Sequence, residues 1–213
     1  MNEIDILPRF RGTLIHDHWK SYYTYQDCQH GLCNAHHIRE LQWVIDKHAQ
    51  HTWAKSIQEL LLEINETVNK TEKNCLDNAA ADAYRMRFRQ IIQTGEAEMP
   101  LPPPEPDQSK KRGREKKPIE RNLLERLRDF ENDVLRFMVE ADVPFTNNRG
   151  ENDIRMTKVQ QKISGCFKSM DGAKIFCRVR SYLLTAQKHG VTPTDALKTL
   201  FDGKLPAVFF TEK

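Results

Sequence analysis

A polar segment late in the chain predicts the start of a helix: Pro144-Phe145-Thr146-Asn147-Asn148-Arg149-Gly150-Glu151-Asn152-Asp153-Ile154-Arg155. Its proline and the run of Thr and Asn favour a turn and supply side chains that cap helices. We expect helix from Glu151 to about Lys162, and at helical spacing four side chains share one face: Glu151, Arg155, Lys158 and Lys162. A carboxylate at the head of a basic stripe suits a hard metal cation beside a phosphate backbone. Asn148-x-x-Glu151 is also the spacing of a capping box, so a structural role for Glu151 stays open.

The composition of this 213-residue chain is that of a soluble domain of moderate size, or of a domain with an insertion. Hydrophobic residues make up 38% and charged residues 30%, and no apolar run is long enough to predict a transmembrane helix. The first residues lack the basic and apolar regions of a secretory signal, so we expect a cytoplasmic protein. Its five cysteines, an odd number at irregular spacing, are then expected to stay reduced.

The charge is unevenly distributed, although the net charge is only +3. Acidic residues gather in 59–66, whereas the segment 110–117 is strongly basic and follows an extended proline-rich run over 99–106. Four of its cations are candidate DNA contacts: Lys110, Lys111, Arg112 and Arg114. The asymmetry favours a polyanionic partner, but a merely solvated tether stays open.

A strand near the N-terminus places one acid in a promising position. Residues Gly12 to His16 predict a strand that ends at Asp17, and residues 18–23 predict a turn into a short helix. Strand ends open onto crevices and hold side chains rigidly, so Asp17 is a candidate for chemistry. The alternative is that Asp17 only caps the helix that follows.

A cysteine and histidine motif follows this strand. It has the form Cys-x4-Cys-x2-His-His, from Cys28 through Cys33 to His36, so zinc must be considered. The spacing matches no common zinc finger, and no second ligand pair follows, so we favour packing of Cys33 in the core and leave zinc open. His36 and Arg39 then share one helical face, near Asp17 or near phosphate.

Apolar spacing predicts helices over most of the remaining chain. One amphipathic stripe, expected to be core, consists of Trp53, Ile57, Leu60, Leu61, Ile64 and Val68. Further helices are expected over 120–143, over 173–189 with an inward face that includes Val179 and Ala186, and from 192 to near 203. We therefore expect an α+β fold that is predominantly α-helical. Its expected parts are a strand and helix part (1–37), a helical insertion (38–95), a proline-rich basic linker (96–119), a C-terminal helical part (120–203) and a tail (204–213).

Four motifs occur in a specific order along the chain. They are Leu7-Pro8-x-Phe10-x-Gly12-Thr13-Leu14-Ile15-His16-Asp17, Leu32-Cys33-Asn34-Ala35-His36-His37-x-Arg39-Glu40-Leu41, Asn147-Asn148-x-x-Glu151-x-x-Ile154-Arg155 and Ser181-Tyr182-Leu183-Leu184-Thr185-Ala186-Gln187-Lys188-His189-Gly190-Val191-Thr192-Pro193. Together they resemble the DDE transposases of bacterial insertion-sequence family 66. The resemblance covers nearly the whole chain and is weakest in the proline-rich basic linker.

The resemblance implies a partial RNase-H-like core with a helical insertion. It implies that Asp17 is the second and Glu151 the third acid of the catalytic set, and that both ligate Mg²⁺. The first acid of that family lies on an earlier strand, and Asp5 is not in a segment that predicts a strand. We therefore expect a truncated copy that is catalytically incomplete by itself.

The implied function is DNA transposition by metal-dependent strand cleavage and joining. Transposon-end DNA would be held by phosphate contacts from Arg155, Lys158, Lys162, the basic run, His36 and Arg39. Implied protein partners are a complete transposase, other insertion-sequence proteins or a second copy of the chain, with the protein at the nucleoid in the cytoplasm. Two alternatives remain: a non-catalytic DNA-binding remnant, and a helical interaction module in which Asp17 and Glu151 are only caps.

Overall fold

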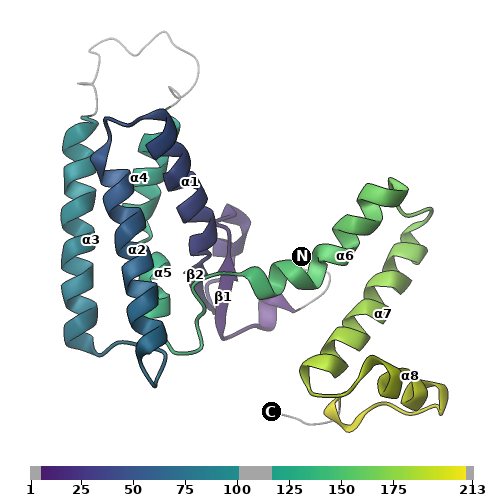
Figure 1. Ribbon diagram of the computed structural model, residues 1–213. Helices are drawn as coiled ribbons and strands as arrows, with labels where there is room; N and C mark the ends of the chain where they lie inside the picture. Colours follow the sequence, from purple (N-terminus) through teal and green to yellow (C-terminus); the bar gives the residue numbers. More distant parts are fainter. Residues whose placement is uncertain (1–5, 101–116, 210–213) are drawn as a thin grey trace. The chain divides into compact units, whose positions relative to one another are not determined.

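The computed structural model describes residues 6–100 and 117–209 (Figure 1). The chain divides into two compact units, Met1–Asn147 and Asn148–Lys213. The first unit contains η2 (Leu7–Arg9), β1 (Thr13–His16), η3 (Lys20–Thr24), β2 (Gln29–Leu32), α1 (Asn34–Lys47), α2 (Thr52–Lys70), α3 (Asn78–Glu98), α4 (Ile119–Asp129), α5 (Glu131–Leu135) and η4 (Arg136–Met138), where η denotes a 3-10 helix. The second contains α6 (Asn148–Ser164), α7 (Met170–Lys188), α8 (Pro193–Phe201) and η5 (Ala207–Phe209). The predicted α+β class with a majority of helix is confirmed.

The described strands form one small parallel sheet. β1 pairs with β2 in a register that runs from Thr13 opposite Gln29 to His16 opposite Leu32. A Cβ atom at Gly31 would lie 2.7 Å from Cδ1 of Ile15, so a larger residue there would require the Ile15 side chain to shift. The predicted strand before Asp17 is confirmed. Two strands do not identify an RNase-H-like sheet, so that part of the expectation stays a prediction.

Side chains that follow α5 fix the position of the sheet. Arg136 donates from Nε to the backbone oxygen of His30 (2.7 Å) and from Nη1 to Gln29 (2.8 Å) and Glu140 (2.6 Å). The hydroxyl of Thr13 on β1 donates to Glu140 at 3.2 Å. Both strands are therefore tied by charge-assisted hydrogen bonds to the same short segment.

The helices of the first unit enclose its hydrophobic core. In Figure 1, α1, α2 and α3 lie side by side, and the predicted stripe of α2 is buried from Trp53 to Val68. Gly95 on α3 lies against this core, where a Cβ would lie 2.8 Å from Cγ of Trp53 and 2.9 Å from Cδ1 of Leu124. The absence of a side chain at Gly95 lets α3 approach α2 and α4 closely. The core role of the tryptophan and leucine stripe is confirmed.

The prediction of a single helix over 120–143 was wrong. α4 ends at Asp129 and α5 begins at Glu131, because Phe130 leaves the helical conformation at φ −114° and ψ 29°. The Phe130 ring packs against His18 and Tyr23, with centroid distances of 4.4 and 5.0 Å. We attribute the break to these tertiary contacts, which outweigh a locally continuous amphipathic pattern.

The described part of the second unit contains three α-helices and the short η5. α6 begins at Asn148, three residues before the expected start, and Lys188 of α7 forms an ion pair with Asp153 of α6. Gly190 ends α7 with φ +79°, and Thr192 caps α8 by accepting the backbone N–H of Asp195. The last helix expected from 192 to near 203 is confirmed. On α7, Ala186 is buried as expected, but Val179 is 46% exposed, so its predicted inward position was wrong.

None of the described helices is long and apolar enough to cross a membrane. The five cysteines are all free thiols, in agreement with the expectation of reduced cysteines.

Candidate functional site

Asp17 lies directly after β1, with its side chain exposed. Its Oδ1 accepts the backbone N–H of Trp19 at 3.2 Å, which closes a turn within two residues. The next helix, η3, begins later and has Trp19 as its N-cap, so Asp17 shapes the turn but does not cap that helix. His18 has φ +68°, a left-handed backbone that is uncommon for a residue with a side chain and marks a constrained turn beside the acid.

A chain of hydrogen bonds through His16 and His30 supports this turn. The backbone N–H of His18 donates to Nδ1 of His16 at 3.1 Å, which leaves Nε2 of His16 as the protonated nitrogen that donates to Nδ1 of His30, also at 3.1 Å. Nε2 of His30 then donates to the backbone oxygen of Tyr25 at 3.1 Å. Burial, with the neighbouring His30 and His18, lowers the pKa of His16 to about 4. The chain therefore requires neutral histidines.

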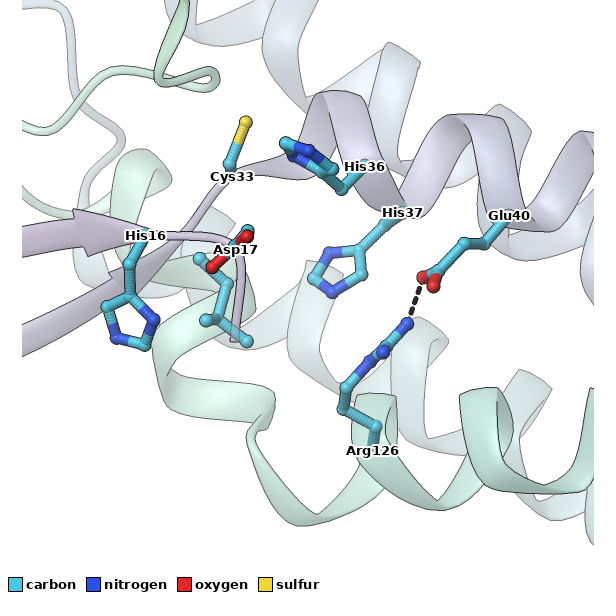
Figure 2. A pocket seen from close by; sticks show the side chains of 8 residues that line it. His16, Asp17, Cys33, His36, His37, Glu40 and Arg126 are labelled. Carbon is cyan, nitrogen blue, oxygen red and sulfur yellow. Dashed lines mark hydrogen bonds and ion pairs between the residues drawn. The ribbon is translucent and has the colours of Figure 1, made fainter. Parts of the chain in front are cut away.

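A small cavity of about 70 Å³ opens beside Asp17 (Figure 2). Its lining comes from the ends of β1 and β2, the start of α1 and one residue of α4: His16, Asp17, Leu32, Cys33, His36, His37, Glu40 and Arg126. Figure 2 shows His36, His37 and Glu40 projecting from α1, with the guanidinium of Arg126 paired to Glu40. The cavity thus brings together a carboxylate, imidazoles and a cation that reaches across from another helix.

The start of α1 is fixed by a buried polar pair. Asn34 is fully buried, accepts a hydrogen bond from Nδ1 of His37 at 2.9 Å and donates to the backbone oxygen of Val134 at 3.0 Å. Burial, with the nearby charge of Arg126, lowers the pKa of His37 to about 3. A neutral His37 therefore forms one wall of the cavity at physiological pH.

The predicted DNA-binding residues of the first unit lie near this cavity or on its helix. His36 lines the cavity together with Asp17, which agrees with one of its two expected placements, the one near Asp17. Arg39 is exposed on α1, where its Nε donates to the backbone oxygen of Ala35 at 3.2 Å. The four cations of the basic run, Lys110, Lys111, Arg112 and Arg114, lie outside the described residues.

The second unit holds the other predicted residues on one helix. Glu151, Arg155, Lys158 and Lys162 all belong to α6, and the three cations are exposed. Their common helix is confirmed, whereas the roles of Glu151 as metal ligand or helix cap stay predictions.

Within the cysteine motif, the expected packing of Cys33 in the core is confirmed, and zinc stays open. Cys33 is buried as expected, and its sulfur accepts the backbone N–H of Asn147 at 3.1 Å. Cys28 donates to the backbone oxygen of Tyr25, and burial raises the pKa of its thiol, which disfavours the thiolate that zinc needs. Within the described part of the chain, Cys28 joins no group of closely spaced metal-binding atoms.

Sequence reasoning missed the residues that complete the cavity. Arg126 was counted only as part of an amphipathic helix, and His16 only as the last residue of a strand. No local signal identifies Arg126, because its contact with Glu40 spans 86 positions. The adjacent pair His36-His37 was the one available hint that α1 presents imidazoles to the site.

Comparison with known proteins identifies the family of this chain. The family model described as Transposase IS66 family matches residues 3–175, which include β1, the cavity residues and all of α6. No curated protein and no solved structure gives a match. The family match spans well over half of the sequence and includes three of the four motifs in full. The chain therefore belongs to the IS66 family of transposases.

Proposed function

We propose that the protein acts in DNA transposition by metal-dependent strand cleavage and joining, with Asp17 and Glu151 as metal-ligating carboxylates. The observation that carries the proposal is the position of Asp17, an exposed carboxylate at the end of a strand and on the rim of a polar cavity, in a chain of this family. Strand ends hold side chains rigidly, as phosphoryl transfer requires. Glu151 is assigned from its motif alone.

Asp17 fits a hard cation such as Mg²⁺ in its chemistry. Mg²⁺ is held by few carboxylates and keeps several waters, and an exposed Asp17 leaves room for both. Bound there, the ion would polarise a phosphate and activate the attacking oxygen. The hydrogen bond from the Trp19 N–H orients the carboxylate, and the buried His16 fixes the backbone of the turn through the N–H of His18.

Cations near each predicted acid suit phosphate contacts. Arg126 reaches the cavity from α4, and Arg39 is exposed on the helix that carries His36. In the second unit, Arg155, Lys158 and Lys162 are exposed on α6. Such contacts position a DNA backbone without reading its sequence, and they make binding salt-dependent.

A second candidate is a DNA-binding protein without catalytic activity. The observation that favours it is that the matched motifs assign two acids, whereas the catalytic set of the family to which they correspond has three. In that case DNA binding through the cations of α6 would persist without cleavage.

The test is strand cleavage and joining on DNA that carries the sequences flanking the gene, with Mg²⁺ present. We expect activity to fall at least about 100-fold in Asp17→Asn and in Glu151→Gln, because the charge that holds the ion is lost. Salt-dependent DNA binding should be retained in both. Matched controls are Asp142→Asn and Glu72→Gln, which remove exposed carboxylates elsewhere. Unchanged cleavage in either acid variant refutes its assignment, and binding without cleavage by the unmodified chain supports the second candidate.

A further inference from the structure

Two histidines and a glutamate converge where α1 ends and where α2 and α4 begin. His48 is the C-cap of α1, His51 is the N-cap of α2, and Glu120 is in the first turn of α4. Each offers one ligand atom, and the three atoms all lie within 4.8 Å of one another. We propose that His48, His51 and Glu120 form a binding site for Zn²⁺ or a similar transition-metal dication, distinct from the cavity at Asp17.

The turn between α1 and α2 brings the two imidazoles together. The backbone N–H of His51 donates to the oxygen of His48 at 2.8 Å, which closes a tight turn with the spacing His-x-x-His. Neither ring is used for capping: α2 has no side-chain cap at His51. The rings lie 5.8 Å apart between centroids, with planes inclined by 32°. A short, closed turn therefore presents both rings to the same space.

One separation is close to that of a tetrahedral site, since Nε2 of His48 lies 3.8 Å from Oε2 of Glu120. Ligands bound to zinc at about 2.0–2.1 Å in a tetrahedron lie roughly 3.3 Å apart, so the three atoms, now within 4.8 Å of one another, would draw closer around an ion. Two imidazole nitrogens with one carboxylate oxygen favour Zn²⁺ over Mg²⁺, which prefers oxygen ligands. A water would take the fourth position.

A second glutamate supports the site as an orienting group. Oε2 of Glu98, at the end of α3, lies 3.6 Å from Nδ1 of His51. Both of these atoms are buried, and neither has a hydrogen-bond partner. The other carboxylate oxygen of Glu98 accepts the N–H of Thr52 at 3.2 Å, which fixes the carboxylate beside the ring. A carboxylate behind a metal-binding histidine sets its orientation and strengthens it as a ligand.

Electrostatics also favour a cation at this position. The side chains of Glu98 and Glu120 are only 20% and 14% exposed, and each faces one histidine. A bound dication would balance the two carboxylate charges while both rings stay neutral. The ion would also join α1, α2 and α4 and fix the two ends of the segment between Glu98 and Glu120. The alternative is a pair of histidine–glutamate ion pairs without metal.

The experiment measures Zn²⁺ binding to the full chain by competition with a chromophoric chelator after removal of all metal. We expect one Zn²⁺ per chain. Its affinity should be at least about tenfold lower when a ligand is replaced, in His48→Gln, His51→Gln and Glu120→Gln. Loss of the orienting carboxylate in Glu98→Gln should lower the affinity about tenfold. His189→Gln, at the exposed C-cap of α7, and Glu59→Gln, at an exposed position farther along α2, should bind like the unmodified chain. Equal affinity in all variants overturns the proposal.

Two further measurements distinguish a loss of zinc binding from a loss of folding, and binding at this site from binding at other residues. In the presence of chelator, the Tm of each ligand variant should be close to that of the unmodified chain. On addition of Zn²⁺, the Tm should rise only in proteins that keep all three ligands. The Co²⁺-loaded protein should show the bands of a tetrahedral ion without thiolate charge transfer. Binding that survives in the ligand variants but is lost in Asp17→Asn would place the ion at the cavity instead, and a thiolate band would place it at cysteine.

Discussion

At the scale of single residues, the site depends on side chains that are buried and polar. Asn34 is completely buried and connects His37 on its own helix with the backbone oxygen of Val134 in α5. It therefore fixes the start of α1, from which His36 and Glu40 reach the cavity. A buried polar group of this kind is stabilising only while each of its partners is satisfied.

We expect Asn34→Ala to lower the free energy of unfolding by about 2–4 kcal/mol, because it leaves the His37 N–H and the Val134 oxygen buried without partners. Urea unfolding followed by circular dichroism measures the change. Asn69→Ala is the matched control, because Asn69 is exposed on α2, and it should change stability by less than about 0.5 kcal/mol. A loss no larger than that of the control would show that the two hydrogen bonds contribute nothing to stability.

At the scale of elements, close packing of helices depends on a residue without a side chain. Gly95 lies where a Cβ would approach Trp53 and Leu124 to less than 3 Å, and both of those side chains are fully buried. Neither can move freely, because the core around them is densely packed. The contact of α3 with α2 and α4 therefore requires glycine at this position.

We expect Gly95→Ala to destabilise the protein by about 1–2 kcal/mol, since overpacking outweighs the better helix propensity of alanine. The clash with Leu124 can be isolated by a double-mutant cycle with Leu124→Ala. The shortened side chain makes room for the new methyl group, so the double variant should be more stable than the sum of the single effects by at least about 0.5 kcal/mol. Strict additivity of the two unfolding free energies would contradict the packing argument.

The elements also show what local pattern can predict here. The strand before Asp17, the buried stripe of α2 and the caps of α8 follow from apolar spacing and from Gly, Pro and Thr at fixed positions. β2 was missed, because Gln29-His30-Gly31-Leu32 has one large apolar residue and its strand conformation comes from pairing with β1. The break at Phe130 was missed for a similar reason, since it follows from contacts with His18 and Tyr23.

In the candidate site, too, local features could be predicted from the sequence and contacts between distant segments could not. Asp17 and His36 were predicted, because a strand end and a helix face are local features of sequence. Arg126 and the pairing of His16 with His30 depend on contacts between distant segments, which no local spacing encodes. Sequence therefore predicted Asp17 and His36 but not Arg126 and His16, which also line the cavity.

At the scale of the whole molecule, buried neutral histidines make stability depend on pH. The pKa of His37 is lowered to about 3 and that of His16 to about 4, in each case chiefly by burial. The half-buried His18 is lowered to about 4 by burial and the charges of Arg126 and Lys20. The ordinary pKa of each ring is 6.5, so between pH 6.5 and 4 the unfolded chain binds protons that the folded chain does not.

Stability should therefore fall as the pH is lowered from 7 to 5, with a limiting slope of about 1.4 kcal/mol per pH unit for each fully buried histidine. The carboxylates with lowered pKa, Glu63 and Glu125, lose their stabilising charge only below their ordinary pKa of 4.5, outside this range. Urea unfolding at several pH values, with chelator present to exclude metal, measures the slope. His37→Gln removes one titrating group and should flatten the slope, whereas His189→Gln, at an exposed position, should leave it unchanged. Stability that stays constant between pH 6.5 and 5 would mean that the folded protein takes up protons at these rings as readily as the unfolded protein. That outcome would contradict the hydrogen bonds through His16, which require neutral rings.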